Sequence, residues 1–209
     1  MIKASLGRRA LLGAFGVLAL SGGGGARALA AAASPVATIE DFYATLLATM
    51  KDGRRLGFAG RRDRLAPAMA RAFDLALMTR LTVGAQWATL KPADQTALIT
   101  SFTAFSVANY ANRFADYSGE RFTVAPQPSP VPGGDVIVHT KLIPSGDTPV
   151  ELDYRLRQGP GGWRVIDVYL KGTVSELATR RSEFTSVLRR GGAPALVALL
   201  KQKTAELSG

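Results

Sequence analysis

The sequence of 209 residues contains no cysteine. Disulfides, thiolate zinc sites, iron–sulfur clusters and a cysteine nucleophile are therefore excluded, and packing alone must hold the fold. Histidine is almost as scarce, because His139 is the only one. A histidine-rich metal site is excluded for that reason, and a Ser–His mechanism would depend on this single side chain. We therefore expect neither a metal nor a cofactor.

Long hydrophobic runs are also missing. The longest, residues 10–20, is too short to span a bilayer, so the mature chain should be soluble. This run follows three basic residues and precedes a glycine tract and small residues, which is the order of a secretory signal. We predict that residues 1–30 are an export signal, cleaved after Ala30 or Ala33, and that the protein is periplasmic. The pair Arg8-Arg9 leaves twin-arginine export open, and an uncleaved anchor is the alternative.

Acidic residues are the minority among the charged ones, and the net charge is +10. The predicted leader holds four basic and no acidic residues, so removing it leaves 22 basic against 16 acidic residues, a net charge of +6. A moderately basic surface can meet nucleic acid or anionic lipid headgroups. Because export favours the second partner, we expect no nucleic-acid binding. The remaining length suits one domain, residues 35–207.

Helical periodicity dominates the first half of the mature chain. Apolar residues recur at three- and four-residue spacing over 35–50 and 64–83. The basic, glycine-interrupted stretch 51–64 between them predicts a loop or a short helical turn. Pro92 opens a long helix that reaches about Tyr117 and is apolar nearly all round. Such a helix must touch two layers, or one layer and a ligand.

The pattern changes to period two between Glu120 and Lys171. Short connections there predict an antiparallel meander. Two closing helices follow, separated at Gly191-Gly192, with Pro194 in the first turn of the second. This order predicts a single α+β domain with helices packed on one face of an antiparallel or mixed, four-stranded curved sheet. The predicted strands are 121–125, 135–143, 150–158 and 163–171.

Few residues are candidates for chemistry. His139 lies in a predicted strand with no serine or acid fixed near it in sequence, which favours a structural or surface role. Asp167 lies in the most apolar strand, where a buried carboxylate could act as a base, although pairing with an arginine or capping a backbone group is favoured. Arg181 shares a helix face with Leu177 and Phe184. An arginine there snorkels, pairs with an acid or meets an anionic ligand at a cavity rim.

Several segments together resemble the MlaC family, which comprises toluene-tolerance proteins, the auxiliary periplasmic components of a lipid ABC transporter. The resemblance rests on GWRVIDVYLKGTVS (162–175), on the RSEF that begins at Arg181, and on VGAQW (83–87) with the aromatic residues of the helix after it. It covers most of the mature chain. The run 178–184 further resembles the hopanoid-associated branch, called HpnM, although Thr179-Arg180 departs from the usual family pattern.

The resemblance implies a non-enzymatic periplasmic shuttle that carries a phospholipid or a hopanoid between the inner and outer membranes. Its partners would be an inner-membrane lipid ABC transporter complex and an outer-membrane lipoprotein. The family fold is a mixed sheet with helices that enclose an apolar pocket. Two alternatives stay open, namely an isomerase-like enzyme that acts on a polycyclic lipid through Asp167, and an envelope adaptor that binds no lipid.

We place the lipid tails between the long helix and the sheet, because both carry many aromatic and aliphatic side chains there. Arg181 would lie nearer the mouth. The residues predicted to bind lipid are Phe102, Phe105, Tyr110, Phe114, Leu152, Tyr154, Trp163, Val165, Tyr169, Phe184 and Arg181.

Overall fold

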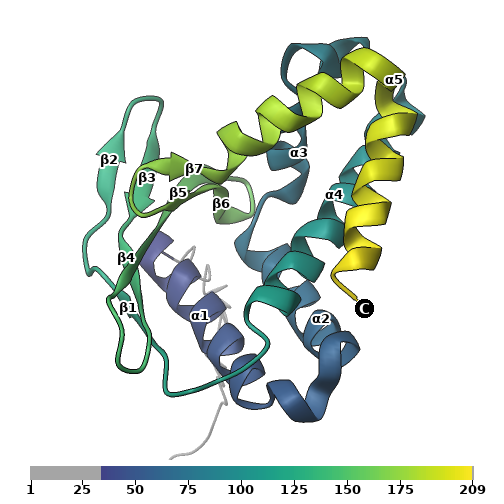
Figure 1. Ribbon diagram of the computed structural model, residues 1–209. Coiled ribbons are helices and arrows are strands. Elements are labelled where there is room, and N and C mark those ends of the chain that lie inside the picture. The colour runs from purple at the N-terminus through teal and green to yellow at the C-terminus, as the bar shows by residue number, and fades with distance from the viewer. Residues whose placement is uncertain (1–33, 209) are drawn as a thin grey trace, which may run out of the picture.

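The computed structural model describes residues 34–208, so the predicted export signal and its cleavage sites lie outside the described residues (Figure 1). No helix in the described part is both long and apolar enough to cross a membrane. The helices are α1 (Pro35–Lys51), α2 (Gly53–Ala72), α3 (Leu75–Val83), the short 3-10 helix η1 (Gly84–Thr89), α4 (Pro92–Arg113) and α5 (Glu176–Glu206). The strands are β1 (Arg121–Val124), β2 (Ser129–Val131), β3 (Asp135–Val138), β4 (Thr140–Ile143), β5 (Val150–Gly159), β6 (Gly162–Leu170) and β7 (Val174–Ser175).

The first helix forms as its periodicity predicts. Its start is set by Ser34, whose Oγ accepts a hydrogen bond of 3.1 Å from the Ala37 N–H, and by Pro35 in the first turn. The residues at helical spacing, such as Ile39 and Leu46, are fully buried. α1 packs along the sheet and anchors it to the helical layer (Figure 1).

The prediction for residues 51–83 is wrong in two respects. The stretch expected to be a loop is helical from Gly53 onward, and only Gly57, with φ 61°, kinks it. The helix expected over 64–83 is interrupted, because Phe73 is extended and the Asp74 N–H donates to the Val165 carbonyl at 2.9 Å. Asp74 then caps α3 by accepting from the Leu77 N–H at 2.9 Å. The strand contact and the cap together override the local periodicity.

The sheet is an antiparallel meander in which β5 is central. β3 and β4 pair with one edge of β5, and β6 pairs with the other. The predicted strand 135–143 is divided at His139 into β3 and β4, and the strand outside it is correspondingly divided into β1 and β2. The four predicted strands are therefore present, with 135–143 broken in two, and β2 and β7 are added where no strand was predicted. Period-two alternation does not show where such irregularities fall.

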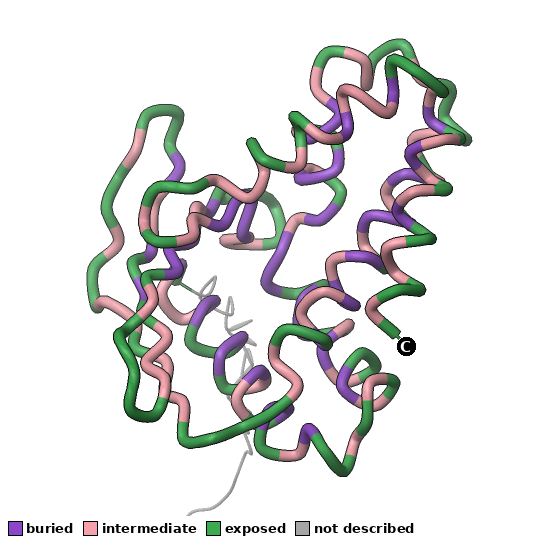
Figure 2. The backbone as a smooth tube through the Cα atoms, viewed as in Figure 1, coloured by how far each residue is buried: buried purple, intermediate pink, exposed green. Residues whose placement is uncertain are grey.

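The two faces of the sheet differ in character. The inner face, toward the helices, carries buried residues such as Val138, Tyr154 and Leu156, and Figure 2 shows burial concentrated where the sheet and the helices meet. The outer face carries charged residues of both signs. There the side chain of Asp135 is fully buried and accepts hydrogen bonds of 2.8 Å from Arg155 Nε and 2.7 Å from Arg157 Nε. The hydrogen bond from Arg157 is the main reason why the pKa of Asp135 lies below its usual value of 3.8.

Because Arg155 and Arg157 bind the ionised form of Asp135, the stability of the fold depends on pH. Because the pKa of Asp135 is lower in the folded chain than in the unfolded chain, its stabilisation is present above pH 3.8 and disappears as the pH falls further. We expect Asp135→Asn to lower the free energy of unfolding by about 2 kcal/mol near neutral pH. The difference from wild type should shrink in urea denaturation at about pH 3. An equal difference at both pH values would contradict this account.

The two long helices differ from prediction only at their ends. α4 ends at Arg113 rather than near Tyr117, and Tyr117 is exposed in the connection to the sheet. α5 is interrupted at Gly192, whose φ of 67° is left-handed, so the prediction of two helices separated at Gly191-Gly192 is confirmed. Figure 1 shows the bend in α5, after which its second half runs back beside α4.

Candidate functional site

An apolar pocket lies between the helices and the inner face of the sheet. Its walls come from the end of α2, from α3, from one face of α4, from the start of α5 and from β5 and β6, and its cavity has a volume of about 80 Å³. Most of the surrounding side chains are aromatic or aliphatic, and the polar ones come from α4 and the first turn of α5 except for Thr82 of α3. The lining residues are Met69, Phe73, Leu75, Met78, Thr82, Phe102, Phe105, Ser106, Asn109, Tyr110, Arg113, Phe114, Leu152, Tyr154, Val168, Leu170, Glu176, Leu177 and Arg180.

Two elements bring together six of the residues that the sequence predicted for lipid binding. α4 and its C-cap residue contribute aromatic side chains at three- to five-residue steps, and β5 contributes two residues of the same parity. These residues face one another across the gap between helix and sheet, where the sequence placed the lipid tails. The six are Phe102, Phe105, Tyr110, Phe114, Leu152 and Tyr154.

The predicted residues of β6 are placed differently. Trp163 and Val165 lie on the inner face but away from this pocket, and Tyr169 lies on the outer face, opposite Asp153. The reason is an irregularity in the pairing of β5 and β6, where Arg155 and Leu156 pair with Asp167 and Val165, so that one residue of β6 is skipped. The skip reverses the parity of the strand. Val168 and Leu170 therefore line the pocket in place of Tyr169.

The two predicted residues of α5 also lie outside the pocket lining. Phe184 is buried behind the wall, with its ring centroid 6.2 Å from that of Phe102. Arg181 is exposed and lies against Gly84, so that a Cβ on this glycine would be 3.0 Å from Arg181 Nη2. Its neighbour Arg180 lines the pocket instead. Both arginines are within a helical turn of Leu177 and Phe184, so spacing alone did not distinguish them.

Arg180 is held at the edge of the pocket by two contacts. Its guanidinium carbon lies 4.6 Å from the ring centroid of Phe105, and its Nη2 lies 3.7 Å from Glu176 Oε2. A signal for this residue was present in the sequence, because Glu176 and Arg180 are four residues apart on a helix. Whether any lining residue binds lipid stays a prediction.

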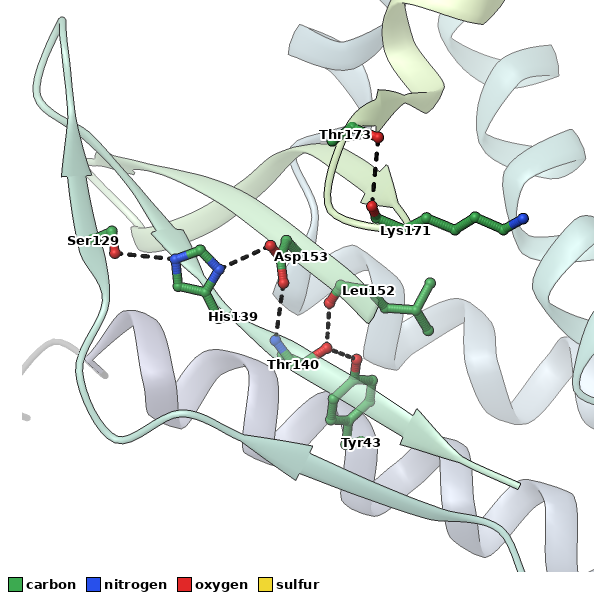
Figure 3. A network of polar contacts seen from close by, with 8 residues as sticks. All are labelled: Tyr43, Ser129, His139, Thr140, Leu152, Asp153, Lys171 and Thr173. Carbon is green, nitrogen blue, oxygen red and sulfur yellow. Dashed lines mark hydrogen bonds and ion pairs between the residues drawn. The ribbon is translucent and has the colours of Figure 1, made fainter. Parts of the chain in front are cut away.

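The inner wall of the pocket is uncharged although it includes tyrosines. Burial raises the pKa of Tyr110 and of Tyr154 well above the usual value of 10.0, and it raises the pKa of Tyr43 behind them to about 12. The Tyr43 hydroxyl lies 2.6 Å from Thr140 Oγ1, and Thr140 Oγ1 donates in turn to the Leu152 carbonyl (Figure 3). The hydroxyls are therefore neutral near pH 7, and the wall remains suited to hydrocarbon.

Asp167 has the capping role that the sequence favoured. Its Oδ2 accepts from Ser175 Oγ at 2.6 Å, and its Oδ1 accepts from the Leu177 N–H at 3.1 Å. Ser175 itself caps α5 by accepting from the Ala178 N–H at 2.9 Å. Asp167 thus fixes the start of α5 and does not line the pocket. Asp167 is therefore not the acid inside the cavity that the enzyme alternative assigned to it.

The structure assembles one arrangement that the sequence did not suggest. On the outer face, His139 Nε2 lies 3.0 Å from Ser129 Oγ and its Nδ1 lies 2.8 Å from Asp153 Oδ2 (Figure 3). This connectivity matches that of a serine-hydrolase triad. However, Ser129 lies in a paired strand and is followed by Pro130, which has no N–H to offer an oxyanion. Because Asp153 Oδ1 also accepts from the Thr140 N–H at 3.1 Å, we interpret the network as a brace across the break between β3 and β4.

Comparison with known proteins agrees with this architecture. The family model of the MlaC protein matches residues 40–202. The chain belongs to the MlaC family. Its structure is similar to that of the phospholipid-binding protein from Ralstonia solanacearum, solved in complex with a phospholipid, with 26% sequence identity and a TM-score of 0.74. The similarity covers 85% of this chain and 100% of the other. The predicted family and the α+β single-domain fold are confirmed, whereas the HpnM branch stays a prediction.

Proposed function

We propose that this MlaC-family protein binds a phospholipid by its acyl chains and carries it through the aqueous periplasm between the two membranes. The observation that carries the proposal is the apolar pocket between α4 and the sheet, whose polar lining residues come mainly from α4 and the start of α5. The phospholipid complex of the Ralstonia solanacearum protein supports it, because that protein shares the fold. The Arg8-Arg9 leader and the family support a periplasmic location.

The energetics explain why a carrier of this kind is needed. A two-tailed lipid exposes on the order of thirty methylene groups, and at about 0.8 kcal/mol each, transit through water is opposed by roughly 24 kcal/mol. A pocket lined by Phe102, Phe105 and Leu152 replaces that water with hydrocarbon contacts. Such a task needs a closable cavity and no catalytic group.

The size of the cavity adds a condition. Its volume of about 80 Å³ is well below the roughly 300–1,000 Å³ of pockets that hold drug-sized ligands. Two acyl chains therefore require α3 and α4 to move away from β5 and β6. Two methionines of the wall, Met69 and Met78, have unbranched, flexible side chains that can repack in such a change. The gap that the lipid hypothesis required is thus present, and it must widen on binding.

The finer parts of the proposal concern cargo and partners. A phospholipid is the cargo that the structural neighbour favours, and a hopanoid is the alternative that the HpnM resemblance suggests. The partners are an inner-membrane lipid ABC transporter complex and an outer-membrane lipoprotein, between which the loaded protein moves.

The test is mass spectrometry of an organic extract of the full chain, expressed with its own leader and purified from the periplasm. We expect near-stoichiometric phospholipid. A hopanoid in the extract would identify a hopanoid as the cargo in place of a phospholipid. A chemically altered lipid would favour the enzyme alternative. A protein that neither co-purifies with lipid nor takes it up from vesicles would overturn the proposal and favour the adaptor.

A further inference from the structure

We propose that the polar residues at the rim of the pocket form a phosphate-recognition site that selects lipids with a phosphate headgroup over uncharged lipids. The inference rests on the proposed lipid-binding function and names the chemistry that the mouth of the pocket recognises. The protein groups that contact the phosphate are the side chains of Ser106, Asn109 and Arg113 from α4 and of Arg180 from α5.

Helical geometry places these groups together. Ser106, Asn109 and Arg113 follow one another at three- and four-residue steps, so they share one face of α4, and all three line the pocket. Arg180 lines the same pocket from the first turns of α5. Arg113 is exposed and the other three are half-buried, whereas Phe102 and Phe105 are buried. The polar groups therefore lie at the rim, where a headgroup would be when its tails are inside.

The hydrogen-bonding capacity of these groups is unused within residues 34–208. The side chains of Ser106, Asn109 and Arg113 make no hydrogen bond or ion pair with any other described residue. Arg180 contacts Glu176 at 3.7 Å, which is longer than a normal charge-assisted hydrogen bond. Three donor side chains without partners and a weakly paired arginine, all lining one apolar pocket, are the kind of polar set that orients a ligand.

The charge of the rim suits a phosphodiester. Arg113 and Arg180 contribute two positive charges, and Glu176 contributes one negative charge, so the lining has a net charge of +1. A phosphodiester carries one negative charge, and the planar guanidinium can bond two of its oxygens at once. The cation–π contact with Phe105 holds the plane of Arg180 at the pocket edge. Glu176 competes with the phosphate for Arg180.

The experiment offers the full-length protein mixed vesicles that contain phosphatidylglycerol and diacylglycerol with identical acyl chains. Mass spectrometry then measures the ratio of the two lipids bound. We expect wild type to favour phosphatidylglycerol by about tenfold or more, which is the effect of a single charge-assisted hydrogen bond. The double variant Arg113→Gln/Arg180→Gln should bring the ratio close to one. Glu176→Gln should raise it.

The matched control is Arg189→Gln/Arg190→Gln, which removes the same charge from exposed positions of α5 outside the pocket. Its ratio should equal that of wild type. Equal uptake of both lipids by wild type, an unchanged ratio in the rim variant, or the same fall in the control would overturn the inference. Saturable binding of inorganic phosphate alone, without discrimination between the lipids, would also overturn it. Uptake of neither lipid by wild type would instead overturn the proposed function itself.

Discussion

Leu152→Asp is expected to abolish lipid retention. Leu152 is 7% exposed and forms the sheet side of the pocket wall, opposite the aromatic residues of α4. A carboxylate there would have to lose its hydration against acyl chains, which costs several kcal/mol. The measurement is lipid per mole of folded protein, from extracts of wild type and variant purified in parallel.

Leu142→Asp is the matched control for this variant. Leu142 lies on β4, is half-buried and packs against the core, but it does not line the pocket. Its variant should keep its lipid when both proteins are compared well below their melting temperatures. Lipid that co-purifies unchanged with Leu152→Asp would show that the tails lie elsewhere. Equal loss from both variants would attribute the effect to general destabilisation.

Gly53→Ala is expected to lower the free energy of unfolding by about 3 kcal/mol, the upper range for an added methyl group that cannot be accommodated. A Cβ at this position would lie 1.9 Å from the Ala115 carbonyl oxygen, so the backbone after α4 would have to move. The same junction is held by buried Arg61, which donates to the Ala111 carbonyl at 2.8 Å and to the Gly53 carbonyl at 3.0 Å. Chemical denaturation at neutral pH measures the change.

Gly159→Ala provides the comparison for this prediction. Nothing lies within 4 Å of a Cβ added at Gly159, and its backbone is not left-handed. We expect a change within about 0.5 kcal/mol. If the two variants were equally stable, α2 and the end of α4 would not be in the close contact described. Because Tyr110 and Phe114 lie at that end of α4, Gly53→Ala should also weaken lipid retention.

The parts of the fold that could be predicted are those with a strong local period. α1 and most of α4 follow a 3.6-residue repeat over several turns, and β5 alternates without interruption from Val150 to Arg157. The break at Gly192 could be predicted because Gly191-Gly192 precedes Pro194. The break between α2 and α3 could not, since it depends on a hydrogen bond between Asp74 and Val165 of a distant strand.

About half of the residues predicted for the site could be placed correctly from the periodicity of the sequence. Periodicity identified the aromatic face of α4 and the apolar parity of β5, and these do face each other across the pocket. It put Tyr169 on the inner face, whereas one skipped residue in β6 turns Tyr169 outward, and it did not single out Arg180, which lines the pocket. The His139 network joins Ser129 and Asp153, ten and fourteen residues away. No spacing rule joins such residues.

The sequence by itself determined the order of helices and strands, the buried face of most of them and, through its motifs, the family. Only the tertiary structure decided how narrow the cavity is and that Arg113 and Arg180 lie at its rim. It also decided which carboxylates, such as Asp135 and Asp167, make structural hydrogen bonds. The physical reason is that a repeat along the chain reports which side of an element leaves water. Cavities, strand register and polar networks depend instead on contacts between segments that the chain brings together only when it folds.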